Sequence, residues 1–539
     1  MMAKVRVSLP TVYDPREWPQ PYSAASMFLA AAAERRPALG ERLEFDFQSF
    51  GSSSDPAEFA RAIVAAKPDI LGLGIYTWNE TVLETAIPII HALSPHTRIL
   101  LGGLSVLYSD AEYFRKFPEV DLFFRGDGEK SFPDVLEHYV DGTYEEVLNG
   151  NILISGVASH ANFPQRVNDR SAVKMPEVVS YYLRDESGTC FFERHADQHW
   201  NCVWWELSRG CVYTCAFCGF DAQELGFRHH SVERVLQEFD VFIEKKVKRV
   251  FITDAILGGK RANAKEILKG LSEPHRRDHN MYIYGFIRPE LVDEEFARLL
   301  HTSNFAFVNV GLQTVNPDVP KEMRANNLSQ IRKNLPWLSR YGVRYQTDLI
   351  AGFPGDTYDG FLDSVRFIIE EAKPTRFRVY QLSVLPGTPL YRLAKEKGPE
   401  WVTYDPKDGS VTSSYSWDGP ELKRMLSFAN FSVALYNYFT QHDWLGDEDR
   451  FRSLDLFHHL YERTLRDEEE FGKWDQKAAS LNQDEESNMW IEAFLKREGI
   501  EQLHLPKKKR SKTRASIPVE MHDPAAYAAA YMRADSVYD

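Results

Sequence analysis

The stretch Glu206-Leu-Ser-Arg-Gly-Cys211-Val-Tyr-Thr-Cys215-Ala-Phe-Cys218-Gly219 places three cysteines in one short segment. It follows an apolar run at 203–207 and precedes a helical pattern that begins near Ser231. A loop between a strand and a helix lets three thiolates converge on an iron-sulfur cluster, and the fourth iron of a 4Fe-4S cluster stays open to another ligand. This spacing arises by chance with a probability on the order of 10⁻³ or less. The loop therefore predicts a 4Fe-4S cluster with the metal ligands Cys211, Cys215 and Cys218.

A structural zinc site is the competing interpretation of these cysteines. Structural zinc usually takes four Cys or His ligands, and the nearest histidines, His229 and His230, lie beyond the loop. Cys190 and Cys202 have no partner at ligand spacing, so we expect them to be small buried residues. The cluster is the favoured hypothesis, and zinc is the alternative.

The composition of the 539-residue chain is that of a soluble globular protein, with 43% hydrophobic and 26% charged residues. We find no apolar stretch of membrane-spanning length and no export signal at the N-terminus. A net charge of -14 disfavours binding to nucleic-acid phosphates. Five clustered cysteines are too few for a disulfide framework. We expect a cytoplasmic protein without a membrane or nucleic-acid partner.

Residues 1–145 alternate strand and helix patterns, which favours a parallel, doubly wound α/β sheet. The expected strands lie at 4–9, 42–47, 69–75, 98–101 and 120–124, with helices at 23–34, 56–66 and 81–93. Ligands of such sheets bind beyond the carboxyl ends of the strands. The loops 76–79, 102–103 and 125–129 are therefore the candidate ligand loops of this domain.

The remaining chain divides into three parts by its pattern. Residues 146–198 read as a linker with irregular strands, and residues 199–400 as six strand and helix units that form an open, partial barrel. Residues 401–539 read as a helical region that caps the substrate site, because strand alternation gives way there to helical patterns. The expected barrel strands are 203–207, 249–253, 281–286, 305–310, 345–350 and 376–382.

The cysteine loop, with Phe217 before its last cysteine, resembles the radical S-adenosylmethionine (SAM) superfamily. Further similar motifs are VFITDA at 250–255, GFIRPEL at 285–291, VGLQT at 310–314, DLIAGFPGD at 348–356 and LPGTPLY at 385–391. The resemblance implies a partial (β/α)6 barrel in which SAM binds the open iron. One electron then cleaves SAM to a 5'-deoxyadenosyl radical inside a pocket that excludes water.

The same resemblance implies four SAM-binding residues at the strand ends. Thr253 and Asp254 would face the methionine amine or the ribose, Arg288 would pair with the carboxylate, and Gln313 would bind the ribose. The structural alternatives are a helix cap for Asp254 and a barrel ion pair for Arg288.

The domain in front of the barrel is similar to the cobalamin-binding domain of class B radical SAM enzymes. Its glycine-containing loops at 72–79, 101–104 and 125–129 would let backbone approach the corrin closely. The DxHxxG motif that supplies a cobalt-binding histidine is absent, so Tyr76, Thr77 or Trp78 would lie beneath the cobalt. Alternatively, these aromatics pack the sheet edge. The resemblance implies cobalamin contacts by Tyr76, Thr77, Trp78, Asn79, Gly102, Gly103, Gly126, Asp127, Gly128 and Glu129.

Together the two resemblances imply a cobalamin-dependent radical SAM methyltransferase. It would move a methyl group from SAM through methylcobalamin to an unactivated carbon or a phosphinate phosphorus of a small metabolite, as in antibiotic biosynthesis. An electron donor such as flavodoxin or ferredoxin would be its partner. The alternatives are a rearrangement or cyclisation enzyme with the same cofactors and a cobalamin or iron-sulfur sensor without catalysis.

Overall fold

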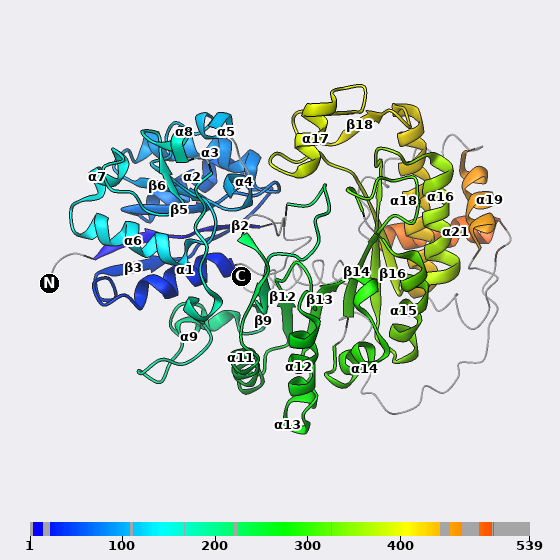
Figure 1. Cartoon of the computed structure of the whole chain (residues 1–539), viewed down its shortest axis with the longest axis horizontal. Coiled ribbons are helices and arrows are strands. Elements are labelled where there is room, and N and C mark those ends of the chain that lie inside the picture. Colours follow the sequence, from blue (N-terminus) through cyan, green and yellow to red (C-terminus); the bar gives the residue numbers. More distant parts are fainter. Residues whose placement is uncertain are drawn as a thin grey trace.

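The computed structural model describes residues 4–13, 22–107, 111–166, 168–219, 225–305, 307–324, 326–441, 453–465, 485–498 and 500. Two sheets of parallel strands dominate it, one coloured blue to cyan and the other mainly green in Figure 1. None of the described helices has the length and apolar character needed to span a bilayer. Residues 501–539, the end of the predicted helical region, lie outside the described residues.

The first sheet has the doubly wound arrangement that the sequence predicted. Its first five strands in space run parallel, with helices α1 (Ala24–Glu34) and α6 (Gly128–Val140) on one face and α2 (Pro56–Ala65) and α3 (Glu80–Leu93) on the other. The strand order is β3 (Leu43–Asp46), β1 (Val5–Ser8), β5 (Ile70–Gly74), β6 (Arg98–Gly102), β7 (Leu122–Phe124) and β8 (Val157–Ser159). A crevice for a ligand is expected at the carboxyl ends of these strands.

Strand β8 lies inside the segment predicted as a linker. It pairs antiparallel with β7, and its three residues are buried. The sheet therefore extends past the expected boundary at residue 145. The sequence of β8 is Val-Ala-Ser, whereas the equally short β7 is the apolar run Leu-Phe-Phe, which explains why the sequence pattern located β7 and not β8.

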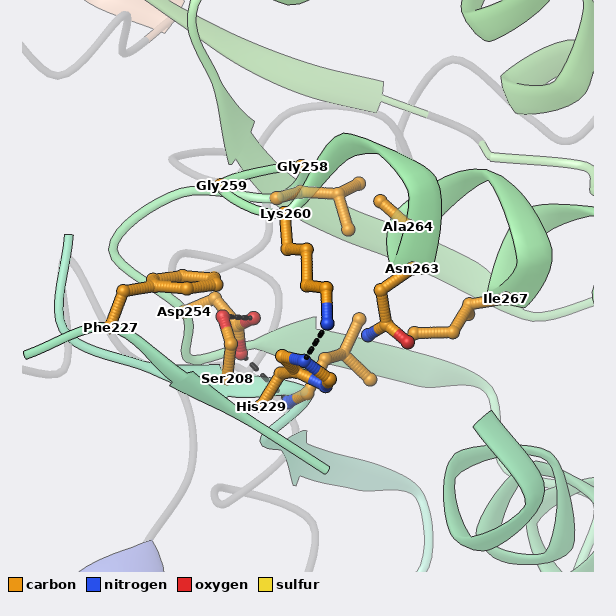
Figure 2. A pocket seen from close by; sticks show the side chains of 12 residues that line it. Ser208, Phe227, His229, Asp254, Gly258, Gly259, Lys260, Asn263, Ala264 and Ile267 are labelled. Atoms are coloured by element: carbon orange, nitrogen blue, oxygen red, sulfur yellow. Dashed lines mark hydrogen bonds between the residues drawn. The ribbon is translucent and has the colours of Figure 1, made fainter. Parts of the chain in front are cut away.

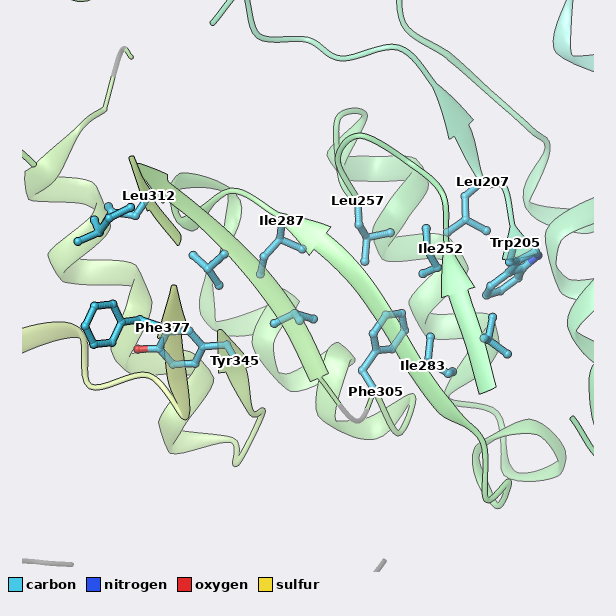
Figure 3. Close-up of a cluster of buried hydrophobic side chains, with 14 of the residues drawn as sticks. Trp205, Leu207, Ile252, Leu257, Ile283, Ile287, Phe305, Leu312, Tyr345 and Phe377 are labelled. Atoms are coloured by element: carbon cyan, nitrogen blue, oxygen red, sulfur yellow. The ribbon is translucent and has the colours of Figure 1, made fainter. Parts of the chain in front are cut away.

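The second sheet is the predicted open barrel. All neighbouring strands pair in parallel, and the outermost strands, β9 and β16, do not pair with each other. Figure 3 shows the buried side chains that these strands contribute, among them Trp205, Ile252 and Ile283. The strand order is β16 (Arg376–Gln381), β15 (Tyr345–Ala351), β14 (Phe307–Gln313), β13 (Tyr282–Ile287), β12 (Arg249–Ile252) and β9 (Cys202–Trp205). The α/β fold class is confirmed.

Helices cover the outer face of this sheet, and the last of them protects its open edge. In α18, Asn437 accepts a hydrogen bond from the Phe377 amide and donates one to the Phe377 carbonyl, each at 3.1 Å. These bonds occupy main-chain groups that an edge strand would otherwise leave unpaired. The helices are α11 (Val232–Glu244), α12 (Arg261–Leu271), α14 (Glu294–Thr302), α15 (Leu328–Arg340), α16 (Tyr358–Arg366) and α18 (Gly419–Gln441).

The prediction that strands end near residue 400 is wrong at one place. Strands β17 (Val402–Tyr404) and β18 (Val411–Ser414) form an antiparallel hairpin, whose turn uses Gly409 at a φ of +75°. The helices predicted after it are present as α18 and α19 (Leu454–Leu465), followed by α21 (Glu485–Arg497). Shorter elements include β2 (Thr11–Tyr13), β4 (Ser49–Gly51), α4 (Leu104–Leu107), α5 (Ala111–Arg115), α7 (Tyr144–Leu148), α8 (Phe163–Arg166), α9 (Phe191–Ala196), β10 (Ser208–Arg209), β11 (Arg228–His229), α13 (Pro274–Arg277) and α17 (Pro389–Lys397).

Gly126 offers a test of how the linker segment packs on the first sheet. A Cβ atom at Gly126 would lie 2.1 Å from the Ser171 carbonyl oxygen, and the residue has a φ of +100°. Gly142 also has a positive φ, +74°, but a Cβ there meets no atom within 4 Å. We expect Gly142→Ala to cost about 1–2 kcal/mol of stability, the price of the left-handed conformation alone. Gly126→Ala should lower the thermal midpoint much further, and equal shifts for the two variants would contradict the described packing.

Candidate active site

The three cysteines lie in the loop between β10 and β11, directly after the first barrel strand, β9. All three are partly exposed and none forms a disulfide. The Cys218 amide donates to the Cys215 carbonyl at 3.0 Å, which makes a tight turn. The Ala216 amide donates to the Glu322 carbonyl at 2.9 Å, and the Ala216 carbonyl accepts from the Leu390 amide at 2.8 Å. Segments after β14 and after β16 therefore hold the loop in place.

Two buried guanidinium groups lie beside this loop. Arg324 Nη1 donates to Cys215 Sγ at 3.2 Å, and Arg288 Nη1 lies 4.0 Å from the same sulfur. Burial raises the pKa of the Cys211 thiol, whereas both arginines act to lower it. Their charge complements the thiolate form that binds iron. Within the part of the chain that the structure describes, no three His, Cys, Asp or Glu side chains are grouped as a site for a single metal ion.

The sequence analysis did not identify Arg324. This residue lies in an irregular segment between β14 and α15, 109 residues from Cys215 in the chain. No strand-end pattern marks it. Arg324 reaches Cys215 only because its segment folds back onto the cysteine loop, as the hydrogen bond from the Ala216 amide to the Glu322 carbonyl shows. This long-range contact has no local pattern in the sequence.

Arg288, predicted to bind the methionine carboxylate, already has partners within the protein. Its Nη2 donates to Glu290 Oε1 at 2.6 Å and to Asn326 Oδ1 at 3.1 Å, and its guanidinium lies 3.9 Å from the Tyr213 ring centroid. Burial acts to lower the pKa of Arg288, but Glu290, Cys215 and Tyr213 together raise it above its ordinary value. The ion pair that we considered as an alternative is present. A contact with SAM stays a prediction.

Gln313 ends β14 in an unusual backbone conformation, with a φ of +64°. Its side-chain oxygen, Oε1, is buried and has no hydrogen-bond partner. A buried polar atom without a partner is uncommon in folded proteins and calls for a ligand or an ordered water. The position fits the predicted contact with a ribose hydroxyl.

Thr253 and Asp254 turn back onto the residues that precede the cysteine loop. Figure 2 shows Asp254 next to Ser208. Asp254 Oδ1 accepts the Leu207 amide at 2.8 Å, and Oδ2 accepts the Ser208 hydroxyl. The Thr253 hydroxyl donates to the Trp205 carbonyl at 3.4 Å. Burial raises the pKa of Asp254 to about 7. Both side chains therefore brace the start of the loop, and Asp254 does not cap the helix that follows, which begins after Lys260.

A stacked, partly exposed aromatic pair marks the carboxyl end of β5 in the first sheet. Tyr76 and Trp78 stack with ring centroids 4.5 Å apart and planes inclined by 4°, and Trp78 is 46% exposed. Asn79 is buried beneath them: its Oδ1 accepts the Tyr76 amide at 2.8 Å, and its Nδ2 donates to the Gly74 carbonyl at 3.0 Å. Thr77 is exposed. Asn79 therefore fixes the loop, and its neighbours present an open flat surface.

The glycines predicted to approach the corrin have close neighbours within the protein. A Cβ at Gly103 would lie 2.5 Å from the Ile75 carbonyl oxygen, and one at Gly128 would lie 2.6 Å from Leu29. Gly126 similarly meets Ser171, as described above. Gly102 has only an ordinary contact, 3.5 Å from Phe124. Close backbone neighbours and a positive φ are therefore sufficient to require Gly103 and Gly126, whereas the neighbour of Gly128 is the end of a flexible leucine side chain.

Asp127 and Glu129 bind arginines of the barrel domain. Arg209 Nη1 lies 3.3 Å from Asp127 Oδ1, and Arg209 Nη2 donates to Glu129 Oε1. Arg228 also pairs with Asp127. These carboxylates were predicted to contact cobalamin, and in the structure they join the third loop of the first domain to the two strands that flank the cysteines.

Two family models match the chain. Residues 205–368 match the model of the radical SAM superfamily, and residues 38–136 match that of the B12 binding domain. The chain therefore carries a radical SAM domain and a B12-binding domain. The predicted cofactors, a 4Fe-4S cluster, SAM and cobalamin, are confirmed at the level of these domain families.

Two curated proteins are similar to this chain over about 60% of its length. The 2-(S-pantetheinyl)-carbapenam-3-carboxylate methyltransferase of Streptantibioticus cattleyicolor is 24% identical over 60% of this chain and 48% of its own length. The cobalamin-dependent radical SAM methyltransferase TokK of Streptomyces tokunonensis is 25% identical over 62% of this chain and 49% of its own length. The chain thus spans about half the length of these curated relatives.

A solved structure has a similar fold. TsrM from Kitasatospora setae, a radical SAM methyltransferase with cobalamin and a 4Fe-4S cluster bound, aligns over 86% of this chain and 100% of its own with a TM-score of 0.59. The sequence identity is 15%, so this likeness concerns the fold alone.

The metal ligands can be tested by replacing Cys211, Cys215 and Cys218 together with alanine. We expect the iron content after anaerobic reconstitution to fall from about four atoms per chain to near zero, because thiolates hold the irons. Cys202→Ala is the matched control, since Cys202 is a buried cysteine outside the loop and should be dispensable for the cluster. A redox-active four-iron cluster in the triple variant would show that the ligands lie elsewhere.

Asp254 gives the stability of the fold a measurable pH dependence. Its pKa is about 7 in the folded protein against an ordinary value of 3.8. Its contribution to stability is therefore fully present below the ordinary value and is lost as the pH rises through about 7. The thermal midpoint of the wild type should fall between about pH 5 and about pH 8, and we expect this fall to be smaller in Asp254→Asn. The corresponding difference in the free energy of unfolding is at most a few kcal/mol.

Asp185→Asn provides the control for this experiment, because the Ser187 hydroxyl and Arg194 lower the pKa of Asp185. That variant should keep the wild-type pH dependence in the same range. An unchanged pH dependence in Asp254→Asn would mean that Asp254 is ionised in the folded protein throughout.

Proposed function

We propose that the chain is a cobalamin-dependent radical SAM methyltransferase. It moves a methyl group from SAM, by way of cobalamin, to an unactivated carbon or a phosphinate phosphorus of a small natural-product metabolite. The observation that carries the proposal is the contact between the two cofactor domains: Arg209, two residues before Cys211, pairs with Asp127 and Glu129. A methyl carrier and a radical generator that act on one substrate need this adjacency. The two relatives named methyltransferases support the reaction type.

The residues around the cysteine loop fit a cluster with SAM. When bound, the cluster and SAM supply a 5'-deoxyadenosyl radical, and cobalamin carries the methyl group. In this proposal Cys211, Cys215 and Cys218 hold three irons. The buried side-chain oxygen of Gln313, which has no partner in the structure, accepts a hydrogen bond from a ribose hydroxyl. Arg324 and Arg288 provide positive charge for the methionine carboxylate.

The carboxyl end of β5 fits a corrin ring. The Tyr76–Trp78 pair offers a flat, partly exposed aromatic surface, and Asn79 holds its loop rigid from below. In this proposal Tyr76, Thr77 or Trp78 would lie beneath the cobalt, and no histidine would bind it. Gly102 and Gly103 shape the adjacent loop.

The proposed domains follow the predicted extents with one addition. Residues 1–145 form the cobalamin-binding domain, and β8 from the 146–198 segment extends its sheet. Residues 199–400 form the radical SAM barrel. Residues 401–539 cap the substrate site. An electron donor such as flavodoxin or ferredoxin completes the system, because radical formation consumes one electron.

Methyl-labelled SAM tests the proposal before the substrate is known. We expect the reconstituted protein with a low-potential reductant to place label in the cobalamin fraction and to release S-adenosylhomocysteine. A sample without reductant is the control, since only reduced cobalamin accepts a methyl cation. If S-adenosylhomocysteine and cobalamin-bound label both fail to form while 5'-deoxyadenosine accumulates, the rearrangement or cyclisation alternative replaces the methyltransferase.

A further inference from the structure

Arg209 sits between the two cofactor domains with its guanidinium surrounded by acids. Its Nε donates to Glu206 Oε2 at 2.9 Å within the barrel domain, whereas Nη1 and Nη2 reach Asp127 and Glu129 of the B12-binding domain. Only 13% of the Arg209 side chain is exposed, and 7% of the Glu129 side chain. The guanidinium also lies 5.3 Å from the ring centroid of Phe28, on α1. All three nitrogens are therefore committed, in fixed directions, to both domains.

A second arginine strengthens the same contact from the opposite strand. Arg228 lies opposite Arg209 in the backbone pairing of β10 with β11. Its Nη1 donates hydrogen bonds to Asp127 Oδ2 and, at 2.9 Å, to the Val173 carbonyl. The Val173 amide in turn donates to Asp127 Oδ2 at 2.9 Å. Asp127 is thus held between the two strands of the hairpin and the backbone of the linker segment.

The position of this network gives it a consequence beyond stability. Strands β10 and β11 are the two ends of the loop that contains the cysteines, and Arg209 is separated from Cys211 by a single residue. Asp127 and Glu129 follow directly after β7, at the sheet edge where ligands of doubly wound domains bind. A planar guanidinium with several directed hydrogen bonds restricts both distance and orientation far more than a flexible ammonium does.

We propose that Arg209 is a positioning residue that fixes the cysteine loop against the third loop of the B12-binding domain and thereby sets the separation of cluster and cobalamin. The inference rests on the two cofactors of the proposed function but not on methyl transfer itself. Simple structural support is the competing role, in which the loss of Arg209 lowers stability and leaves the relation of the cofactors unchanged.

Electron paramagnetic resonance of the protein loaded with both cofactors separates these roles. The reduced cluster and cob(II)alamin each carry an unpaired electron, so their dipolar coupling reports their separation without any turnover. We expect a single resolved dipolar coupling in the wild type. In Arg209→Gln we expect a broad distribution of couplings, because the distance between the two cofactors is no longer fixed. Arg209→Lys, which keeps the charge without the planar fork, should recover the coupling only in part.

Arg276→Gln is the matched control. Arg276 is 15% exposed and makes two hydrogen bonds to Asp240 inside the barrel domain, so its loss removes a comparably buried guanidinium away from the domain contact. This variant should lose stability but keep the wild-type coupling. If Arg209→Gln does not fold, Glu129→Gln takes its place. This substitution removes the negative charge of one partner of Arg209 and leaves the size of the side chain nearly unchanged.

Two results would overturn the inference. One is an unchanged coupling in Arg209→Gln or, where that variant does not fold, in Glu129→Gln. The other is a wild-type protein with both cofactors bound but no defined coupling. Failure of the methyl-labelling experiment is distinguishable from both, since the coupling requires bound cofactors and no transfer of the methyl group.

Discussion

A guanidinium group that is buried where two domains meet must find carboxylates on both sides, because an unpaired buried charge is costly. Arg209 meets this requirement with Glu206 in its own domain and with Asp127 and Glu129 in the other. Removing one partner of such a buried pair typically costs about 3–5 kcal/mol. Arg209 and His230 together hold the pKa of buried Glu206 at about 2, so this carboxyl is ionised at neutral pH. The cysteine loop, its two strands and the loop after β7 therefore behave as one connected unit.

This connection brings together the ends of two parallel sheets. In each sheet the side chains and loops that can bind ligands lie at the carboxyl ends of the strands, and the helices cover the faces. The B12-binding domain contributes the stacked Tyr76 and Trp78, and the radical SAM domain contributes the three-cysteine loop with Arg324 and Gln313 at its side. The barrel is open between β9 and β16, and Asn437 protects the exposed edge of β16.

The strands of both sheets could be predicted from sequence because strands buried on both faces are short apolar runs between turn signals. The run predicted at 69–75 is β5 at Ile70–Gly74, and the run at 345–350 is β15 at Tyr345–Ala351. The same reasoning expected irregular strands in 146–198 without locating β8, and it missed the hairpin of β17 and β18. The sequences Val-Ala-Ser, Val-Thr-Tyr and Val-Thr-Ser-Ser of these strands contain too few large apolar residues to form an apolar run. The cysteine loop was identifiable because its spacing is local.

The partners of charged residues could not be predicted, since they depend on contacts between distant parts of the chain. Glu129 meets Arg209 across 80 residues, and Asp127 meets Arg228 across 101. Sequence position alone therefore suggested that these two acids face cobalamin. Gly126 shows the same limit: a glycine after a strand indicates a close approach, but not that the approaching group is the backbone of Ser171.

The proposed arrangement requires the iron-sulfur cluster and the cobalt to lie at the strand ends that face each other. Anomalous X-ray scattering from crystals of the fully loaded protein, collected at the iron and cobalt absorption edges, locates both in one experiment. We predict an iron peak enclosed by Cys211, Cys215 and Cys218, and a cobalt peak over the carboxyl ends of β5 and β6 on the side that faces the iron. A zinc signal in place of iron at the cysteines, or cobalt away from those strand ends, would contradict the account.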